Sequence, residues 1–128
     1  MQRMKIAALA VMTLAWAGSA GSAPAADDPA MIALATKSGC LTCHAIKAAP
    51  PSDRDAKPIG PAWQDVAIKY KGQKNAMQVL TATVIGGSNP YASHWKGKVS
   101  GLAMPPNAVA IRRPEARQLV RWILSLSN

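Results

Sequence analysis

Phenylalanine is absent from this 128-residue chain, and aromatic residues make up only 5% of it. Acidic residues are also few, with six Asp and Glu against fifteen Lys and Arg. Proteins that bind nucleic acid commonly combine clustered basic residues with aromatic side chains that stack on bases. Because the lysines here are scattered and the aromatic side chains are few, the composition argues against a nucleic-acid partner and favours an acidic protein partner.

Cysteine and histidine are equally scarce, with two residues of each. Two cysteines exclude the framework of several disulfides that stabilises many small secreted domains. A zinc site would need all four side chains, but His94 lies far from Cys40, Cys43 and His44 and without zinc-finger spacing. A thioredoxin-like thiol pair needs a βαβ context, and no segment of the chain is rich in strand-forming residues.

The N-terminus has the three parts of a secretory signal peptide. A basic start over residues 1–5 precedes an uncharged apolar run from Ile6 to Ala17 and then a small-residue stretch that contains Ala23-Pro24-Ala25. A retained membrane anchor is the alternative, but the apolar run is shorter than the ~20 residues that span a bilayer. We therefore expect cleavage of residues 1–25, a single domain over residues 26–128, and no stable membrane insertion of the mature protein.

The segment Cys40-Leu41-Thr42-Cys43-His44 matches the C-x-x-C-H signature of covalent c-type haem attachment. Two thiols at this spacing can each add to one vinyl group of a haem, and the histidine that follows can bind the iron. A disulfide between the two cysteines is the structural alternative, but a bond that closes so small a loop is usually catalytic. Since haem attachment in bacteria takes place outside the cytoplasm, the signal peptide agrees with the motif. We expect one haem c, bound through Cys40 and Cys43.

Short helices joined by loops rich in proline and glycine are predicted for the rest of the chain. Asp28-Pro29 is a typical helix start, and Gly39 is a typical stop that would place Cys40 directly at the helix end. The predicted fold is all-α, with about four short helices and long loops around one haem, which supplies an apolar plate that a domain of this size needs. The predicted helices lie within residues 28–39, 62–71, 75–87 and 114–126.

The chain offers candidates for both axial positions of the haem iron. His44 is the first by position, and the carbonyl of Pro61 is a candidate acceptor for its other ring nitrogen, with Gly60 allowing close approach. Met104 is the favoured second ligand, because it lies in a loop and the two prolines that follow restrict the backbone. The other methionines of the predicted helices read as core residues. His94 is the rival ligand, and an open iron site is the third possibility.

Together these features resemble a known family, the bacterial class I cytochromes c, and within it the small cytochrome c-551 (c8) group. The resemblance covers most of the mature chain in the family's order. It implies the class I cytochrome c fold, His44/Met104 ligation, the Pro61 hydrogen bond, a Trp95 hydrogen bond to a haem propionate, and an Asn107 contact with the Met104 sulfur. It also implies a periplasmic electron carrier rather than an enzyme. The matching segments are 40–44, 59–66, 67–72, 87–88, 104–107 and 115–126.

Two segments, 45–58 and 88–103, are longer than is usual in that family. The predicted function is that of a diffusible one-electron carrier between periplasmic redox proteins. The longer segments motivate an alternative, a dedicated haem c subunit of a periplasmic oxidoreductase complex, because extra loops can serve as docking surfaces. A third class, an enzyme or gas sensor with an open iron site, requires that Met104 does not bind the iron.

The expected partners are acidic redox proteins that bind transiently. Removal of Arg3 and Lys5 with the signal peptide lowers the formal net charge from +9 to +7, and a basic surface steers acidic partners in a salt-dependent way. Redox encounters of this kind bury small interfaces, and nothing in the sequence demands more than a monomer. The candidate steering residues are Lys37, Lys47, Lys69, Lys71, Lys96 and Lys98.

Overall fold

A computed structural model describes residues 27–50 and 56–127 of the chain. The expected signal peptide and the middle of the 45–58 segment lie outside these residues. The described chain is helical, without strands, as the sequence predicts, and none of its helices is long and apolar enough to cross a membrane. The elements in order are α1 (Pro29–Lys37), the 3-10 turn η1 (Cys40–Thr42), α2 (Trp63–Tyr70), α3 (Ala76–Gly86), α4 (Arg113–Leu124) and the 3-10 turn η3 (Ser125–Ser127).

The start of α1 follows directly from its sequence. The side-chain Oδ1 of Asp28 accepts hydrogen bonds from the backbone N–H groups of Ala30 at 3.0 Å and Met31 at 3.2 Å, which satisfies two otherwise unpaired donors of the first turn. The helix ends at Lys37, and Gly39 takes a left-handed φ of 73°. This turn separates α1 from η1, so the haem motif begins a new short element and is not a continuation of the helix.

The C-terminal helix α4 begins with a charged cap. The guanidinium of Arg112 donates to the Glu115 carboxylate at 3.1 and 3.0 Å, and the Arg112 backbone N–H also donates to that carboxylate at 3.1 Å. The helix begins at Arg113, one residue before Pro114, which is the start that the sequence predicts. Its buried face holds Ala116, Leu119, Val120, Trp122 and Ile123.

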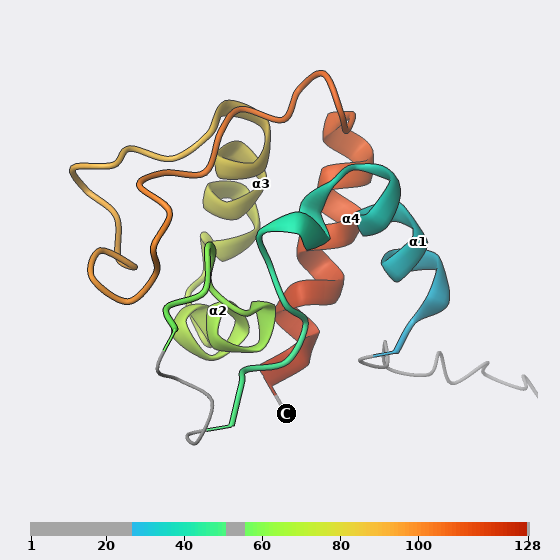
Figure 1. Ribbon diagram of the computed structural model, residues 1–128. Coiled ribbons are helices and arrows are strands. Elements are labelled where there is room, and N and C mark those ends of the chain that lie inside the picture. The colour runs from blue at the N-terminus through green and yellow to red at the C-terminus, as the bar shows by residue number, and fades with distance from the viewer. Residues whose placement is uncertain (1–26, 51–55, 128) are drawn as a thin grey trace, which may run out of the picture.

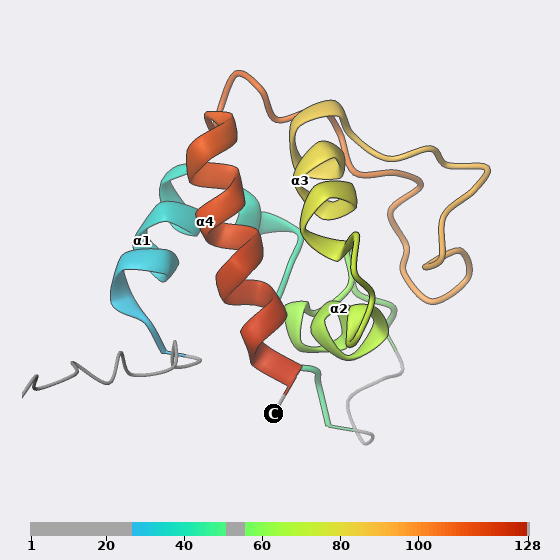
Figure 2. The same cartoon turned by 180° about the vertical axis from the view of Figure 1, so that it is seen from behind.

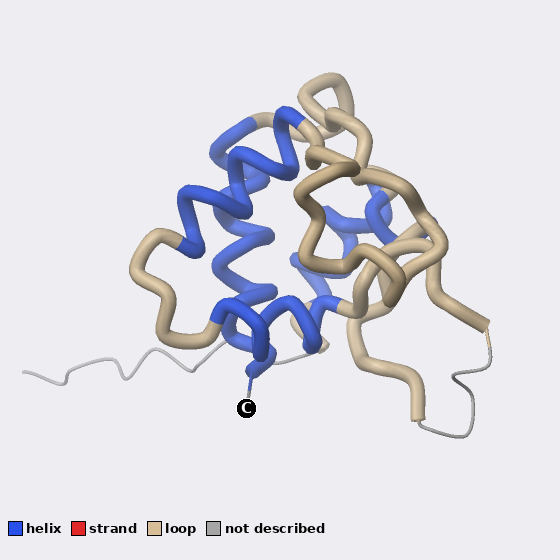
Figure 3. Tube along the Cα trace, turned by 90° about the vertical axis from the view of Figure 1, so that its left-hand side faces the viewer, coloured by secondary structure: helices blue, strands red, loops and turns tan. Residues whose placement is uncertain are grey.

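The core forms where the other helices pack against α4, and Leu119, Val120 and Trp122 are its largest fully buried side chains. Trp63 of α2 meets Trp122 edge to face, with ring centroids 5.6 Å apart. Figures 1 and 2 show α4 running between α1 on one side and α2 and α3 on the other. Figure 3 shows the helices gathered on one side of the molecule and the long loops on the other. The helices thus form the back of a site that the loops complete.

Candidate haem site

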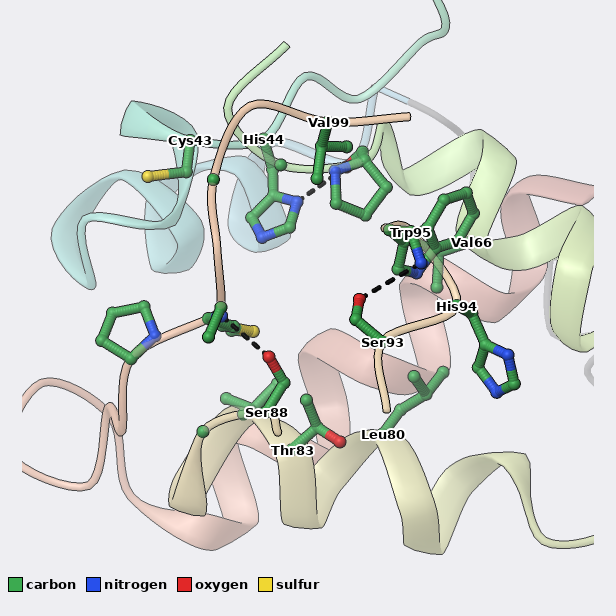
Figure 4. Close-up of a pocket in the computed structure, with 18 of the residues that line it drawn as sticks. Cys43, His44, Val66, Leu80, Thr83, Ser88, Ser93, His94, Trp95 and Val99 are labelled. Carbon is green, nitrogen blue, oxygen red and sulfur yellow. Dashed lines mark hydrogen bonds between the residues drawn. The ribbon is translucent and has the colours of Figure 1, made fainter. Parts of the chain in front are cut away.

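A mostly apolar cavity of about 360 Å³ lies between the helices and the long loops. Helices α2, α3 and α4 contribute Val66, Leu80, Val84, Val120 and Ile123, and the loop side is formed by residues of the 88–105 region. Cavities of roughly 300–1,000 Å³ with apolar walls and a few polar groups are typical of cofactor sites. Figure 4 shows His44 on one side of this space, with Thr83, Leu80 and Ser88 on the opposite side.

His44 is held in one orientation by its neighbours. Its Nδ1 lies 2.7 Å from the carbonyl oxygen of Pro61, so Nδ1 carries the proton and Nε2 is left with a free lone pair. Burial lowers the pKa of His44, outweighing the opposite effect of the Pro61 carbonyl. The ring also stacks on Trp63, with centroids 5.8 Å apart and planes 23° apart. A neutral imidazole with one nitrogen fixed by a carbonyl is the form that binds a metal.

The position of the His44 ring requires a glycine at residue 60, because a side chain there would collide with the ring. A Cβ at this position would lie 2.9 Å from His44 Cε1 and 3.0 Å from His44 Nδ1. The backbone N–H of Gly60 donates to the carbonyl of Cys43 at 2.8 Å, which draws the 58–61 loop against the haem motif. The close approach of Gly60 that the sequence suggests is thus present in the structure.

Cys40 and Cys43 are free, half-buried thiols, of which Cys40 is the first residue of η1 and Cys43 directly follows its last. Burial raises the pKa of Cys40. The backbone N–H groups of Cys43 and His44 both donate to the carbonyl of Cys40, at 3.3 and 3.1 Å, so the five-residue motif forms one compact turn. Cys43 and His44 line the same cavity, and no three His, Cys, Asp or Glu side chains come together in the described part of the chain.

Met104 lines the cavity from the loop side and is fixed through its backbone. Its N–H donates to the hydroxyl of Ser88 at 2.8 Å, and its carbonyl accepts from the Ser88 N–H at 2.9 Å. Gly87 packs so closely that a Cβ there would lie 2.8 Å from the Met104 carbonyl oxygen. Its φ of 81° and ψ of 177° place it in a region that is essentially restricted to glycine.

The rival ligand, His94, lies at the rim of the cavity. Its side chain is exposed and contacts Tyr70 edge to face at 6.3 Å, and Figure 4 shows it directed away from His44. Trp95, the next residue, is half-buried and also lines the cavity. The Nζ of Lys98 lies 6.0 Å from its ring centroid. The hydrogen bond from Trp95 to a propionate stays a prediction.

Asn107 anchors the end of the Met104 loop to α3. Its side-chain Nδ2 donates to the carbonyls of Val84 at 3.2 Å and Pro105 at 2.7 Å, and its backbone N–H also donates to Val84. The structure therefore gives this amide a role in holding the loop of Met104, while the expected contact with the Met104 sulfur stays a prediction. An asparagine that directly follows a pair of prolines gives no sequence signal that its side chain will bond to the carbonyls of Val84 and Pro105.

The residues present fit a covalently bound haem. Two free thiols and a neutral, oriented histidine line or adjoin an apolar cavity, a methionine lies on the cavity's loop side, and two glycines leave the space that side chains would fill. Sequence reasoning found the cysteines and both candidate ligands. It missed Ser88 as the partner of Met104 and Trp63 as the ring that stacks on His44, because both contacts join residues far apart in the sequence.

Curated relatives and solved structures agree with this site. The chain is 39% identical over 94 residues to cytochrome c-552 of Hydrogenobacter thermophilus, covering 73% of this chain and 78% of that protein. It is 38% identical over 100 residues to cytochrome c-551 of Pseudomonas aeruginosa, covering 78% of each. The crystal structure of Nitrosomonas europaea cytochrome c552 superposes with a TM-score of 0.56 at 32% identity, covering 75% of this chain and 99% of that one. No family model matches the chain.

All-α architecture, a C-x-x-C-H turn and an apolar cavity define a mono-haem c-type protein. The identities and coverage go further: the chain belongs to the small bacterial class I cytochromes c, electron-transfer proteins that carry covalent haem c. The family and fold predicted from the sequence are confirmed.

Proposed function

We propose that this protein is a diffusible periplasmic one-electron carrier in which His44 and Met104 occupy both axial positions of the haem iron. Haem iron supplies a one-electron change of oxidation state when it is bound. The chain's own residues then have three tasks, namely to hold both ligands still, to exclude water, and to leave no position open for a substrate.

The observation that carries the proposal is the independent fixation of the two ligand residues. His44 is held by Pro61 at 2.7 Å, and the backbone of Met104 is held by two hydrogen bonds to Ser88 at 2.8 and 2.9 Å. Ligands that are already oriented need little rearrangement when the iron changes charge, because their positions do not depend on the metal alone. His/Met ligation also raises the reduction potential of a haem.

Support for a carrier also comes from the surface. The mature chain has a formal charge of +7, and the candidate steering lysines within the described residues are all exposed. Exposed charges act over about one Debye length, ~8 Å at physiological ionic strength, so they accelerate encounter with acidic redox proteins without building a tight complex. We expect rates of electron exchange that fall steeply with added salt.

The experiment that tests the carrier function is isolation of the protein from its native host without detergent. Osmotic shock should release it with the periplasmic fraction, and haem staining after size exclusion should place it at the elution volume of the recombinant monomer. Stable co-elution with a second polypeptide would favour the alternative, a dedicated haem c subunit of a periplasmic complex. Retention in the membrane fraction would contradict removal of residues 1–25 as a signal peptide.

A further inference from the structure

The outer face of α4 carries a row of arginines that the haem site does not use. Arg113, Arg117 and Arg121 are spaced four residues apart, so they follow one another along one face of the helix. At ~1.5 Å of rise per residue the row is about 12 Å long. All three are exposed. None of them lines the cavity, whereas Val120 and Ile123 of the same helix do.

No carboxylate pairs with this row within the described residues. The ion pair at the start of α4 joins Arg112 to Glu115 at 3.0 Å and lies beside Arg113, the first residue of the row, without including it. Of the helices that pack against α4, α1 and α3 have no acidic residue within their bounds, and Asp65 of α2 forms no ion pair with the row. Figure 2 shows α4 at the near surface of the molecule in the rear view, with α1 on one side and α3 on the other. The row is therefore an uncompensated positive surface.

Arginine and lysine are distributed differently in the part of the chain that the structure describes. Every arginine of the described chain lies within residues 112–121, while the lysines are spread over the other elements and loops. Lysine serves general solubility and long-range steering as well as arginine does. Arginine differs because its planar guanidinium binds a carboxylate through two parallel hydrogen bonds. The concentration of arginine on one helix face thus indicates direct hydrogen bonding to carboxylates of a partner in addition to long-range attraction by charge.

A membrane surface fits the row less well. Anionic lipid attracts lysine and arginine about equally, so it gives no reason for this difference in distribution. Surface helices that bind bilayers also present large apolar side chains beside their basic ones. The exposed positions of α4 hold three arginines with Pro114 and Gln118, which offer nothing large and apolar to insert.

We propose that Arg113, Arg117 and Arg121 form a second docking surface, separate from the haem cavity, for a protein that presents a row of carboxylates. Acidic residues four apart on a helix repeat every ~6 Å and match the arginine row. Exposed ion pairs are individually weak, so the contact is transient. The inference goes beyond the carrier function, because this surface holds a partner without covering the cavity and serves a free carrier and a complex subunit alike.

The test uses the 15N-labelled holoprotein and a defined probe. The probe is a capped, alanine-rich helical peptide with three glutamates at four-residue spacing, and its control has the same composition in scrambled order. Titration followed by two-dimensional NMR should shift the amide and guanidinium signals of α4. The R113K/R117K/R121K variant keeps every charge but loses the paired hydrogen bonds, so it should bind the peptide about tenfold more weakly. The R117Q/R121Q variant tests the loss of charge from the row, and K57Q/K74Q, which removes the same charge elsewhere on the surface, is its matched control. Only R117Q/R121Q should weaken binding strongly.

The outcomes separate the alternatives. Equal binding by the lysine variant and the wild type would overturn the proposal, because charge alone would then explain it. Equal binding of the scrambled peptide, or shifts confined to residues around the cavity, would overturn it as well. If the wild type and the lysine variant both bind phosphatidylglycerol vesicles more tightly than the glutamate peptide, the row is a lipid-binding surface and the proposal is wrong. The haem spectrum and the rate of reduction by a small molecule should be unchanged in each variant. A loss of peptide binding then reports on the arginine row and not on the carrier function.

Discussion

Gly87→Ala tests how the protein holds Met104. The new Cβ would lie 2.8 Å from the Met104 carbonyl oxygen and 3.0 Å from the Pro106 nitrogen, which are backbone atoms that cannot rotate away. The backbone conformation, with φ of 81° and ψ of 177°, is also strained for any residue with a side chain. Strain and overpacking each cost about 1–3 kcal/mol, so we expect a combined loss of about 3 kcal/mol in the free energy of unfolding.

Gly86→Ala is the matched control, because Gly86 is the preceding residue and differs in both respects. A Cβ there meets no atom within 4 Å, and its φ is not positive. Replacing such a glycine by alanine changes stability by less than ~1 kcal/mol and tends to increase it. The pair therefore compares the same substitution at two adjacent positions.

Guanidinium unfolding of the two oxidised holoproteins, followed by circular dichroism, gives the free energies directly. Gly87→Ala should also weaken the far-red sulfur-to-iron band of the oxidised protein, since the strain falls on the Met104 loop. Gly86→Ala should keep that band. If Gly87→Ala unfolds at the same denaturant concentration as Gly86→Ala and retains the band in full, the close packing of Gly87 against Met104 does not hold the ligand.

Three further outcomes are expected. Gly60→Ala should displace the His44 ring and destabilise the protein by about 1–3 kcal/mol, measured by the same unfolding assay; a wild-type midpoint would contradict the packing of Gly60 against His44. The hydrogen bonds from Arg112 hold the pKa of Glu115 at about 2, so its contribution to stability is complete above its ordinary pKa of 4.5 and is lost as the pH falls towards 2. The difference in melting temperature between wild type and Glu115→Gln should accordingly shrink from pH 6 to pH 2, and a constant difference would refute the assignment. His94→Gln should leave the spectrum and the reduction potential unchanged, because His94 is exposed and directed away from His44; loss of the low-spin spectrum would make it a ligand.

Local signals carried most of what the sequence could predict. Asp28-Pro29 marks the start of α1, and the spacing of apolar residues marks α4, because caps and helical periodicity are properties of neighbouring residues. The motif from Cys40 to His44 is likewise local, and it identifies the cofactor without any knowledge of the fold.

Long-range contacts could not be predicted in the same way. Ser88 holds Met104 across 16 residues, and Trp63 stacks on His44 across 19 positions of sequence. Nothing in the sequence around Ser88 or around Trp63 indicates that Met104 and His44 are their partners. The Pro61 hydrogen bond was predictable because a ligating histidine needs an acceptor and a glycine beside Pro61 permits close approach.

The central claim, that His44 and Met104 close both axial positions, is tested most directly by the optical spectrum of the mature holoprotein. Wild type should show sharp reduced c-type bands, the far-red band when oxidised, and no tight carbon monoxide binding when reduced, and Met104→Ala should lose the far-red band and bind carbon monoxide. A wild-type c-type spectrum without the far-red band, or with tight carbon monoxide binding at neutral pH, would contradict the account and leave an open or differently ligated iron.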